Sequence, residues 1–206
     1  MRTRANPPTR EVLDRIGRSV VARGLWVTVV VGLAARLPGL VSKPLWYDEA
    51  FSVLFSRAGL SAMMSGTLAA TGASAAEIHP LLYYVLLGRW ASILGESGAA
   101  VRALSLVFGM GTLAAAYLLA RQLFGPRSGI ACGLIVAISP FQIHYSQEVR
   151  MYSLLACLLM TATLLLREAM RRDAWAAWLG FADLSAAAQY THNLAAFFLL
   201  PLALPP

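Results

Sequence analysis

Leu81-Leu82-Tyr83-Tyr84-Val85-Leu86-Leu87-Gly88-Arg89-Trp90-Ala91-Ser92-Ile93-Leu94 is the stretch that decides the topology of this chain. A helix needs about 20 apolar residues to cross the hydrocarbon core of a bilayer, with about 17 as a lower limit. This stretch is shorter than that limit and carries Arg89. We therefore predict a helix that lies in the membrane interface, where Tyr83, Tyr84 and Trp90 suit the headgroup level.

The composition around this stretch is typical of a polytopic membrane protein. Hydrophobic residues make up 58% of the chain and charged residues 13%, which is too apolar for a soluble domain of this size. The net charge is +7, but the arginines separate long apolar runs, a pattern that argues against a nucleic-acid-binding domain. Cys132 and Cys157 lie inside apolar runs, so we interpret them as small buried side chains rather than a disulfide or a metal pair.

The apolar runs predict an all-α polytopic transmembrane bundle of about six spans. We divide the chain into a basic cytoplasmic segment, 1–23, and a transmembrane domain, 24–206, which we expect to be incomplete at its C-terminus. The basic segment and the run after it are interpreted as a signal anchor rather than a cleaved signal peptide. Arg36, near the end of this run, is expected to snorkel to the interface. The predicted spans are roughly 25–41, 99–120, 129–144, 151–166, 174–190 and 194–204.

The charged loops support the interfacial position of residues 81–94. If this stretch crossed the membrane, the arginine-rich segments 121–127 and 167–172 would lie outside and residues 148–150 inside, which inverts the positive-inside rule twice. If it lies in the interface, every loop obeys the rule, with the N-terminus in the cytoplasm. The polar residues then predicted on the outer face are Asp48, Glu49, Glu77, His79, Glu96, His144, Glu148, Arg150, His192 and Asn193.

The outer loop, residues 42–98, is therefore long and is predicted to contain interfacial helices. Phe51, Leu54, Phe55 and Ala58 recur at helical spacing, which indicates an amphipathic surface helix. A second interfacial helix follows His79 and Pro80. We expect these helices to form a roof over a lipid-facing cavity.

Several polar residues have structural interpretations that stay open beside the functional ones. The Asp48-Glu49 pair could cap the first interfacial helix, where an acid is favourable by about 0.3–1 kcal/mol. Glu148 and Arg150 could form a structural ion pair at the end of a span. Asp183 lies within a predicted span, which makes it a functional hypothesis, although Ser185 and Gln189 nearby suggest a buried polar patch. Gly109 and Gly111 are interpreted as helix-packing residues rather than a nucleotide loop.

Four motifs occur in order along the chain: Trp-Tyr-Asp-Glu-Ala at 46–50, His-Pro-Leu-Leu-Tyr-Tyr at 79–84, Ser-Pro-Phe-Gln-Ile-His-Tyr-Ser-Gln-Glu-Val-Arg-Met-Tyr at 139–152, and Tyr-Thr-His-Asn at 190–193. With these motifs the chain resembles the GT-C glycosyltransferases, in particular the protein-mannosyltransferase-like and aminoarabinose-transferase-like group that includes the Rgt-type enzymes. The resemblance covers Trp26 to Leu200. Such enzymes have many more spans, so the chain looks like the N-terminal part of their fold.

The resemblance implies an enzyme that takes a sugar from a polyprenyl-phosphate carrier at the outer face of the cell inner (plasma) membrane. The sugar passes to a lipid, glycan or protein acceptor, usually with inversion, and no nucleic acid is involved. By motif match Asp48 is the base, with Glu49 beside it as the second catalytic candidate. The residues expected to bind substrate or phosphate are His79, Glu148, Arg150, Tyr152 and His192. We expect no metal to be required, although Asp48, His79 and Glu148 offer oxygen and nitrogen ligands that leave a divalent ion open.

The residue chemistry agrees with this interpretation. An acceptor hydroxyl is a poor nucleophile without a base, and a leaving phosphate needs a cation such as the planar guanidinium of Arg150. One alternative is a transporter or flippase of lipid-linked substrates, which should carry charged or broken segments at mid-membrane depth. The charges here gather at the ends of spans on one face, which favours an enzyme. A further alternative is an inactive, truncated fragment.

Overall fold

The computed structural model describes residues 7–41, 43–65, 67–70, 73–76 and 79–203. Glu77, predicted on the outer face, lies outside the described residues. The elements, in chain order, are α1 (Pro7–Val41), α2 (Tyr47–Arg57), α3 (Gly59–Ser65), β1 (Thr67–Ala70), β2 (Ala73–Ala76), α4 (Leu82–Leu94), α5 (Gly98–Phe124), α6 (Pro126–Ile138), α7 (Pro140–Ser146), α8 (Tyr152–Arg172), α9 (Trp175–Gln189) and α10 (Ala195–Ala203).

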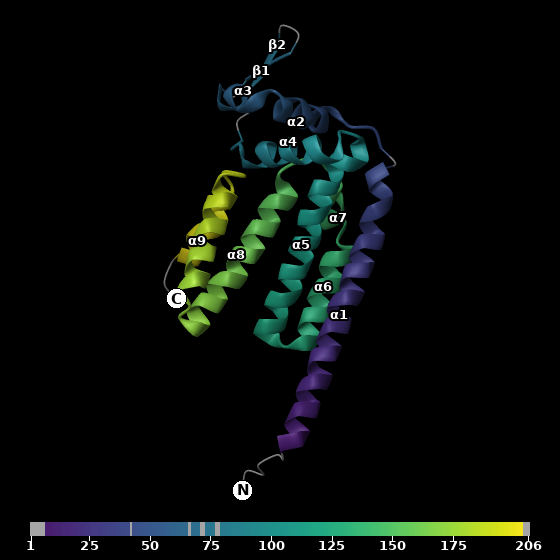
Figure 1. The fold of residues 1–206 in the computed structure, drawn as a ribbon, viewed down its shortest axis with the longest axis vertical. Helices are drawn as coiled ribbons and strands as arrows, with labels where there is room; N and C mark the ends of the chain where they lie inside the picture. The colour runs from purple at the N-terminus through teal and green to yellow at the C-terminus, as the bar shows by residue number, and fades with distance from the viewer. Residues whose placement is uncertain (1–6, 42, 66, 71–72, 77–78, 204–206) are drawn as a thin grey trace.

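Five helices, α1, α5, α6, α8 and α9, form a bundle, and two others lie across one end of it (Figure 1). We call the end that α2 and α4 cross the covered end and the opposite end the open end. The strands β1 and β2 pair as an antiparallel hairpin that projects beyond the covered end (Figure 1). The all-α fold class is thus confirmed, with this hairpin as an addition that the sequence did not predict.

Three described helices are long and apolar enough to cross a membrane. They are the Arg23–Val41 part of α1, α5 and α8, and a fourth span is obtained if α6 and α7 are counted as one bent span. The helices α9 and α10 occupy the predicted positions of the last two spans but are shorter. The chain is therefore a helical membrane protein, while the expected number of about six spans is not confirmed.

The two predicted interfacial helices are present as α2 and α4, and they pack against each other. The Phe55 and Tyr84 rings meet edge to face, with centroids 4.9 Å apart, and both side chains are fully buried. Gly88 allows the closest approach, because a Cβ there would lie 2.9 Å from the carbonyl oxygen of Ser56. Together with Tyr83 and Leu87, these residues belong to a core that α2 and α4 share with α5.

The predicted span 129–144 is bent by 61° between α6 and α7. Pro140 begins α7, where its missing N–H would have had no partner within the helix. Buried Arg36 satisfies the carbonyl groups that the break leaves free, donating to Ala137 O (2.8 Å) and Val136 O (3.2 Å). The expectation that Arg36 snorkels is wrong, because these carbonyls need a donor inside the bundle.

The basic and the polar loops lie at opposite ends of the bundle. The arginine-rich segments 121–127 and 167–172 lie where α5 ends, α6 begins and α8 ends, and these helix ends are at the open end, as is the start of α1 (Figure 1). Residues 139–152 and 190–193 lie at the covered end. The sequence predicts that the arginine-rich segments and the polar motifs lie on opposite sides, and the structure confirms that they lie at opposite ends of the bundle.

The two cysteines and Asp183 differ in how they are placed in the bundle. Cys132 and Cys157 are both free thiols, as predicted, although each is only partly buried. Asp183 is exposed on α9, whereas the neighbouring Ser185 hydroxyl is buried and unpaired among the described groups. The interpretation of Asp183 as part of a buried polar patch with Ser185 is therefore wrong, because the Asp183 side chain lies on the exposed surface of α9.

Gly109 and Gly111 pack against neighbouring helices, as the sequence predicts. A Cβ at Gly109 would lie 2.1 Å from Ser146 Oγ and 2.8 Å from Ser146 Cβ, on α7. A Cβ at Gly111 would approach Cys157 Sγ, on α8, at 2.7 Å. The contact at Gly109 is the closer of the two. It is also harder to relieve, because Ser146 is fully buried and its hydroxyl accepts a hydrogen bond from Arg36 Nε at 3.1 Å.

We predict that Gly109→Ala lowers the free energy of unfolding by about 1–3 kcal/mol, the usual cost of overpacking. The measurement is reversible unfolding in mixed detergent micelles. Gly111→Ala is the matched control, because it makes the same change on the same helix but needs only a shift of the Cys157 thiol. Gly111→Ala should change the free energy of unfolding little, because the higher helix propensity of alanine, worth about 1 kcal/mol, offsets the cost of moving the thiol. Equal losses in the two variants would contradict the prediction.

Candidate active site

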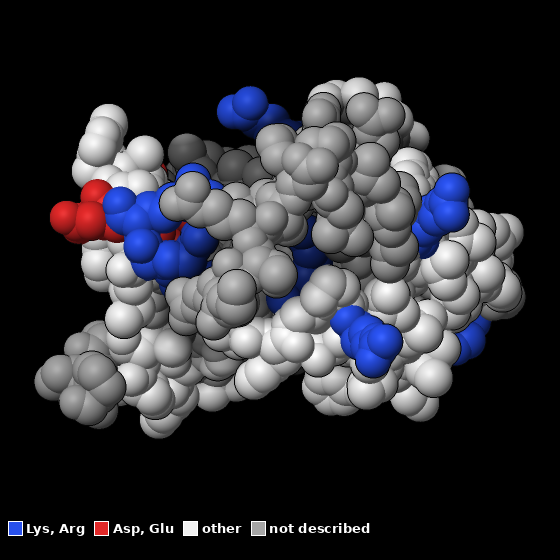
Figure 2. Space-filling model, turned by 90° about the horizontal axis from the view of Figure 1, so that it is seen from below, with Lys and Arg blue, Asp and Glu red and all other residues white. Residues whose placement is uncertain are grey.

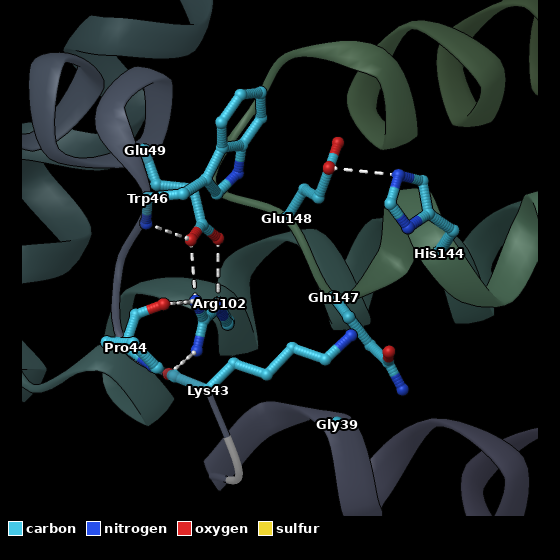
Figure 3. A pocket seen from close by; sticks show the side chains of 9 residues that line it. All are labelled: Gly39, Lys43, Pro44, Trp46, Glu49, Arg102, His144, Gln147 and Glu148. Atoms are coloured by element: carbon cyan, nitrogen blue, oxygen red, sulfur yellow. Dashed lines mark hydrogen bonds and ion pairs between the residues drawn. The ribbon is translucent and has the colours of Figure 1, made fainter.

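The covered end is held by a buried ion pair between Glu49 on α2 and Arg102 on α5 (Figure 3). Arg102 donates from Nε to Glu49 Oε1 (2.8 Å) and from Nη2 to Glu49 Oε2 (2.5 Å). The Glu49 side chain is 1% exposed and that of Arg102 is 3% exposed. This two-point contact of a planar guanidinium with a carboxylate is the strong form of an ion pair.

Both partners also bind backbone groups from other segments. Glu49 accepts from the backbone N–H of Val149 (3.1 Å) and from that of Trp46 (3.2 Å). Arg102 donates to three carbonyls between the end of α1 and the start of α2. These are Lys43 O (2.7 Å), Pro44 O (3.0 Å) and Leu40 O (3.4 Å). The pair thus joins α1, α2 and α5 to the segment that connects α7 with α8.

Sequence reasoning missed Arg102. The signal was present, because an arginine in the second turn of an otherwise apolar span requires a partner, and an acidic pair precedes it in the chain. Part of the capping hypothesis for the Asp48-Glu49 pair is also confirmed. Glu49 occupies the third position of α2 and accepts from the N-cap backbone of Trp46.

A cavity of about 420 Å³ opens beside the ion pair. Its wall includes Lys43, Trp46, Gln147 and both members of a second pair, His144 and Glu148 (Figure 3). His144 Nε2 lies 3.0 Å from Glu148 Oε1, so Glu148 pairs with His144, whereas an ion pair with Arg150 was the alternative that the sequence left open. The Lys43 side chain extends across the cavity toward Gln147 (Figure 3), which gives the cavity a cation besides Arg102.

The pKa of the Glu148 carboxyl is raised above its usual value. Burial is the main cause, because it disfavours the charged form, and the nearby Glu49 and Asp48 carboxylates add to it. His144 and Arg150 act in the opposite direction. Glu148 is therefore protonated at a higher pH than an ordinary glutamate.

Arg150, Tyr152, His192 and His79 form a second group at the same end. The Arg150 guanidinium lies 6.0 Å from the centre of the Tyr152 ring, within the range of a cation–π contact. The His192 ring lies 6.0 Å from that of Tyr152 and 4.8 Å from that of His79. The pKa of His192 is lowered by burial, by His79 and by Arg150, which favours the neutral imidazole.

Asp48 lies between these groups, in the first turn of α2 and partly buried. Its carboxylate is close enough to raise the pKa of both Glu148 and Arg150. The structure therefore brings Asp48, Glu148 and Arg150 together, with the histidines and Tyr152 adjoining Arg150. Glu49, next to Asp48 in the chain, is directed away into the pair with Arg102.

Asp48, His79 and Glu148 are residues of this end whose side chains could serve as metal ligands. Among the residues that the structure describes, no three His, Cys, Asp or Glu side chains are placed to hold a metal ion. Asp48, His79 and Glu148 are therefore not grouped as metal ligands in the described structure.

The comparison with known families gives one match. Residues 78–204, more than half of the chain, match the family model described as dolichyl-phosphate-mannose-protein mannosyltransferase. The matched region includes Glu148, Arg150 and both histidines of the second group, whereas Asp48 lies before it. No curated protein and no solved structure matches the chain.

We predict that Glu49→Gln and Arg102→Gln each lower the free energy of unfolding by about 3–5 kcal/mol, because each leaves a buried charge without its partner. The double variant should lose less than the sum of the two, as a double-mutant cycle in mixed micelles would measure. The control is Glu96→Gln, which breaks the exposed pair of Arg57 with Glu96 and should cost about 0–1 kcal/mol. Additive effects at Glu49 and Arg102 would count against direct coupling.

The raised pKa of Glu148 predicts a pH dependence. The folded state favours the protonated carboxyl, so this contribution to stability is present at low pH and is lost as pH rises through the folded-state pKa. Glu148→Gln, which cannot ionise, should therefore become more stable relative to the wild type as pH rises above the ordinary glutamate value of 4.5.

Infrared difference spectra of the two proteins measure the same titration through the carboxylic C=O band. His144→Ala should move the band to a still higher pH, because the His144 cation stabilises the Glu148 carboxylate. A Glu148 band that titrates at or below the ordinary value would contradict the assignment.

Proposed function

Because this chain belongs to the dolichyl-phosphate-mannose-protein mannosyltransferase family, a group of membrane glycosyltransferases, we propose that it moves a sugar from a polyprenyl-phosphate carrier to a lipid, glycan or protein acceptor. We further propose that the covered end is its active site and that Asp48 is the base. The observation that supports this most directly is the convergence of Asp48, Glu148 and Arg150 at one end of the bundle, from segments about 100 residues apart.

The position of the site suits a substrate that stays attached to the bilayer. The carrier's prenyl tail is apolar, so the sugar phosphate has to reach the enzyme at the level of the membrane surface. Asp48 lies in the first turn of α2, and Glu148 and Arg150 lie between α7 and α8, at the end of the bundle that α2 and α4 cross (Figure 1). An apolar cavity of about 370 Å³ between α7 and α8 is lined by Tyr152, Tyr145 and Leu194, and it adjoins the second group.

The proposed reaction is a single displacement at the anomeric carbon of the sugar. The acceptor oxygen forms a bond to that carbon as its proton passes to Asp48, and the carbon–oxygen bond to the phosphate breaks. The phosphate leaves with the bonding electron pair, and the guanidinium of Arg150 stabilises the charge that it gains. Such a displacement inverts the configuration at the reacting carbon. We assign His192, whose lowered pKa favours the neutral imidazole, and the adjoining His79 to hydrogen bonds with the phosphate or the sugar.

Glu49 is better suited to positioning than to accepting a proton. Its two oxygens already take hydrogen bonds from Arg102, Val149 and Trp46, and it is almost fully buried. Glu49 follows Asp48 in the first turn of α2. Its bonds to Arg102 and Val149 anchor this turn to α5 and to the α7–α8 connection. We infer that they thereby orient the Asp48 carboxylate. We therefore assign the base to Asp48 and keep Glu49 as the residue that orients it.

The charge distribution supports an orientation with the covered end outside the cell. The basic loops gather at the open end, and loops rich in Lys and Arg stay in the cytoplasm. With this orientation the protein would lie in the plasma membrane with its active site facing outward. The carrier-linked sugar would then be used on the extracytoplasmic side.

We predict that Asp48→Asn abolishes sugar transfer, with a loss of at least 100-fold, the lower range for removal of a general base. The assay follows radiolabelled sugar from a panel of polyprenyl-phosphate donors, mannosyl phosphate among them, into membranes that contain the protein. Arg150→Gln should lower the rate constant of transfer more than donor binding, since Arg150 acts on the leaving phosphate.

The matched controls are Asp173→Asn and Arg89→Gln, which make the same chemical changes at exposed positions that are not among the site residues. Both should retain transfer. Equal transfer by Asp48→Asn and the wild type would exclude Asp48 as the base and leave helix capping as its role. Donor movement across the bilayer without sugar transfer would instead support the transporter alternative.

A further inference from the structure

The open end of the bundle carries a groove and a basic cluster that the proposed reaction does not use. The groove lies between the last turns of α5 and α8, has a volume of about 370 Å³ and is lined by Leu119, Leu123, Thr163, Leu166 and Met170. A second cavity of about 390 Å³ adjoins it, and its wall is almost entirely charged or polar. Arg167 and Arg171 belong to both walls, so the two cavities are parts of one continuous surface.

The basic cluster consists of four arginines and one acid: Arg121, Arg167, Arg171, Arg172 and Glu168. Glu168 pairs with Arg171 at 3.1 Å and with Arg172, which leaves an excess of positive charge. Figure 2 views the molecule from this end, where basic side chains are prominent and acidic ones gather beside a basic group at the left edge.

Arg167 is held in place across the junction of the two helices. Its guanidinium donates to Gln122 Oε1 (2.6 Å) and to Gln122 O (2.7 Å), so it ties α8 to the last turn of α5. Arg167 therefore forms a fixed boundary between the apolar groove and the basic cavity, rather than a mobile side chain in solvent.

We propose that this surface binds one anionic phospholipid, with an acyl chain along the groove and the phosphate among the arginines. The groove belongs to two helices that qualify as membrane spans, so the molecules available to fill it are lipids. The arginines lie where those spans end, at the depth of the headgroups, and basic pockets between transmembrane helices bind anionic headgroups. Guanidinium groups match the planar geometry of phosphate oxygens.

The excess charge selects the class of lipid. A zwitterionic headgroup brings a cation that the arginines would repel, whereas a phosphatidylglycerol headgroup brings a net negative charge. The remaining explanation of the arginines is that they offset the helix dipoles at the C-terminal ends of α5 and α8 and retain this end in the cytoplasm. If that explanation alone held, the protein would not prefer one lipid over another, and no acyl chain would occupy the groove.

Native mass spectrometry of the full chain tests the proposal. Protein delipidated in a non-ionic detergent is titrated separately with dioleoyl-phosphatidylglycerol and dioleoyl-phosphatidylcholine, and the bound lipids are counted. Phosphatidylglycerol should bind at least about tenfold more tightly, and Arg121→Gln with Arg171→Gln should remove about tenfold or more of that affinity. Thr163→Phe, which fills the groove without changing the charge, should weaken binding as well.

The matched control is Arg89→Gln with Arg127→Gln, which removes the same charge from two exposed positions outside both cavities, Arg127 at the same end of the bundle. It should bind phosphatidylglycerol as the wild type does. Three outcomes would overturn the proposal: equal affinity for the two lipids, equal losses in the test and control variants, or full displacement of the lipid by glycerol phosphate, which lacks acyl chains. Because the readout is lipid bound at the open end, it does not depend on sugar transfer at the covered end.

Discussion

The covered end of this protein depends on the buried ion pair between Glu49 and Arg102. A charge taken out of water is costly unless a partner and further hydrogen bonds satisfy it. Here the pair and its hydrogen-bond partners come from four segments: the end of α1 with the residues that follow it, the start of α2, the first turns of α5 and the α7–α8 connection. Satisfying these two charges therefore fixes four segments relative to one another, and the proposed site lies among them.

Arg36 has the same function inside the bundle. Where α6 ends and α7 begins, backbone carbonyls would lie inside the bundle without a donor, which is costly where water is excluded. Arg36 supplies donors to Ala137 and Val136 and also to the Ser146 hydroxyl. Gln147 in turn donates to the backbone carbonyl of Arg36 at 2.8 Å. A buried arginine thus makes the bend between α6 and α7 possible, and the bend brings residues 146–152 to the site.

The charged residues at the two ends of the bundle differ in sign and in burial. At the covered end acids and bases are interleaved and most are at least partly buried, so neighbouring groups shift one another's pKa, as for Glu148 and His192. At the open end the charge is mainly positive and more exposed, which suits attraction to anionic headgroups. The helices α5 and α8 connect these two environments across the membrane.

The sequence by itself determined the class of fold, the presence at residues 81–94 of a helix too short to count as a span, the division of basic and polar segments between the ends, and most of the residues gathered at the covered end. These follow from length, hydropathy and charge, which act locally along the chain. Only the tertiary structure decided which acid of the Asp48-Glu49 pair is sequestered, that Arg102 is its partner, and that Arg36 is buried rather than snorkelling. Adjacent residues on a helix point in different directions, so their roles depend on which distant groups the packing brings to each.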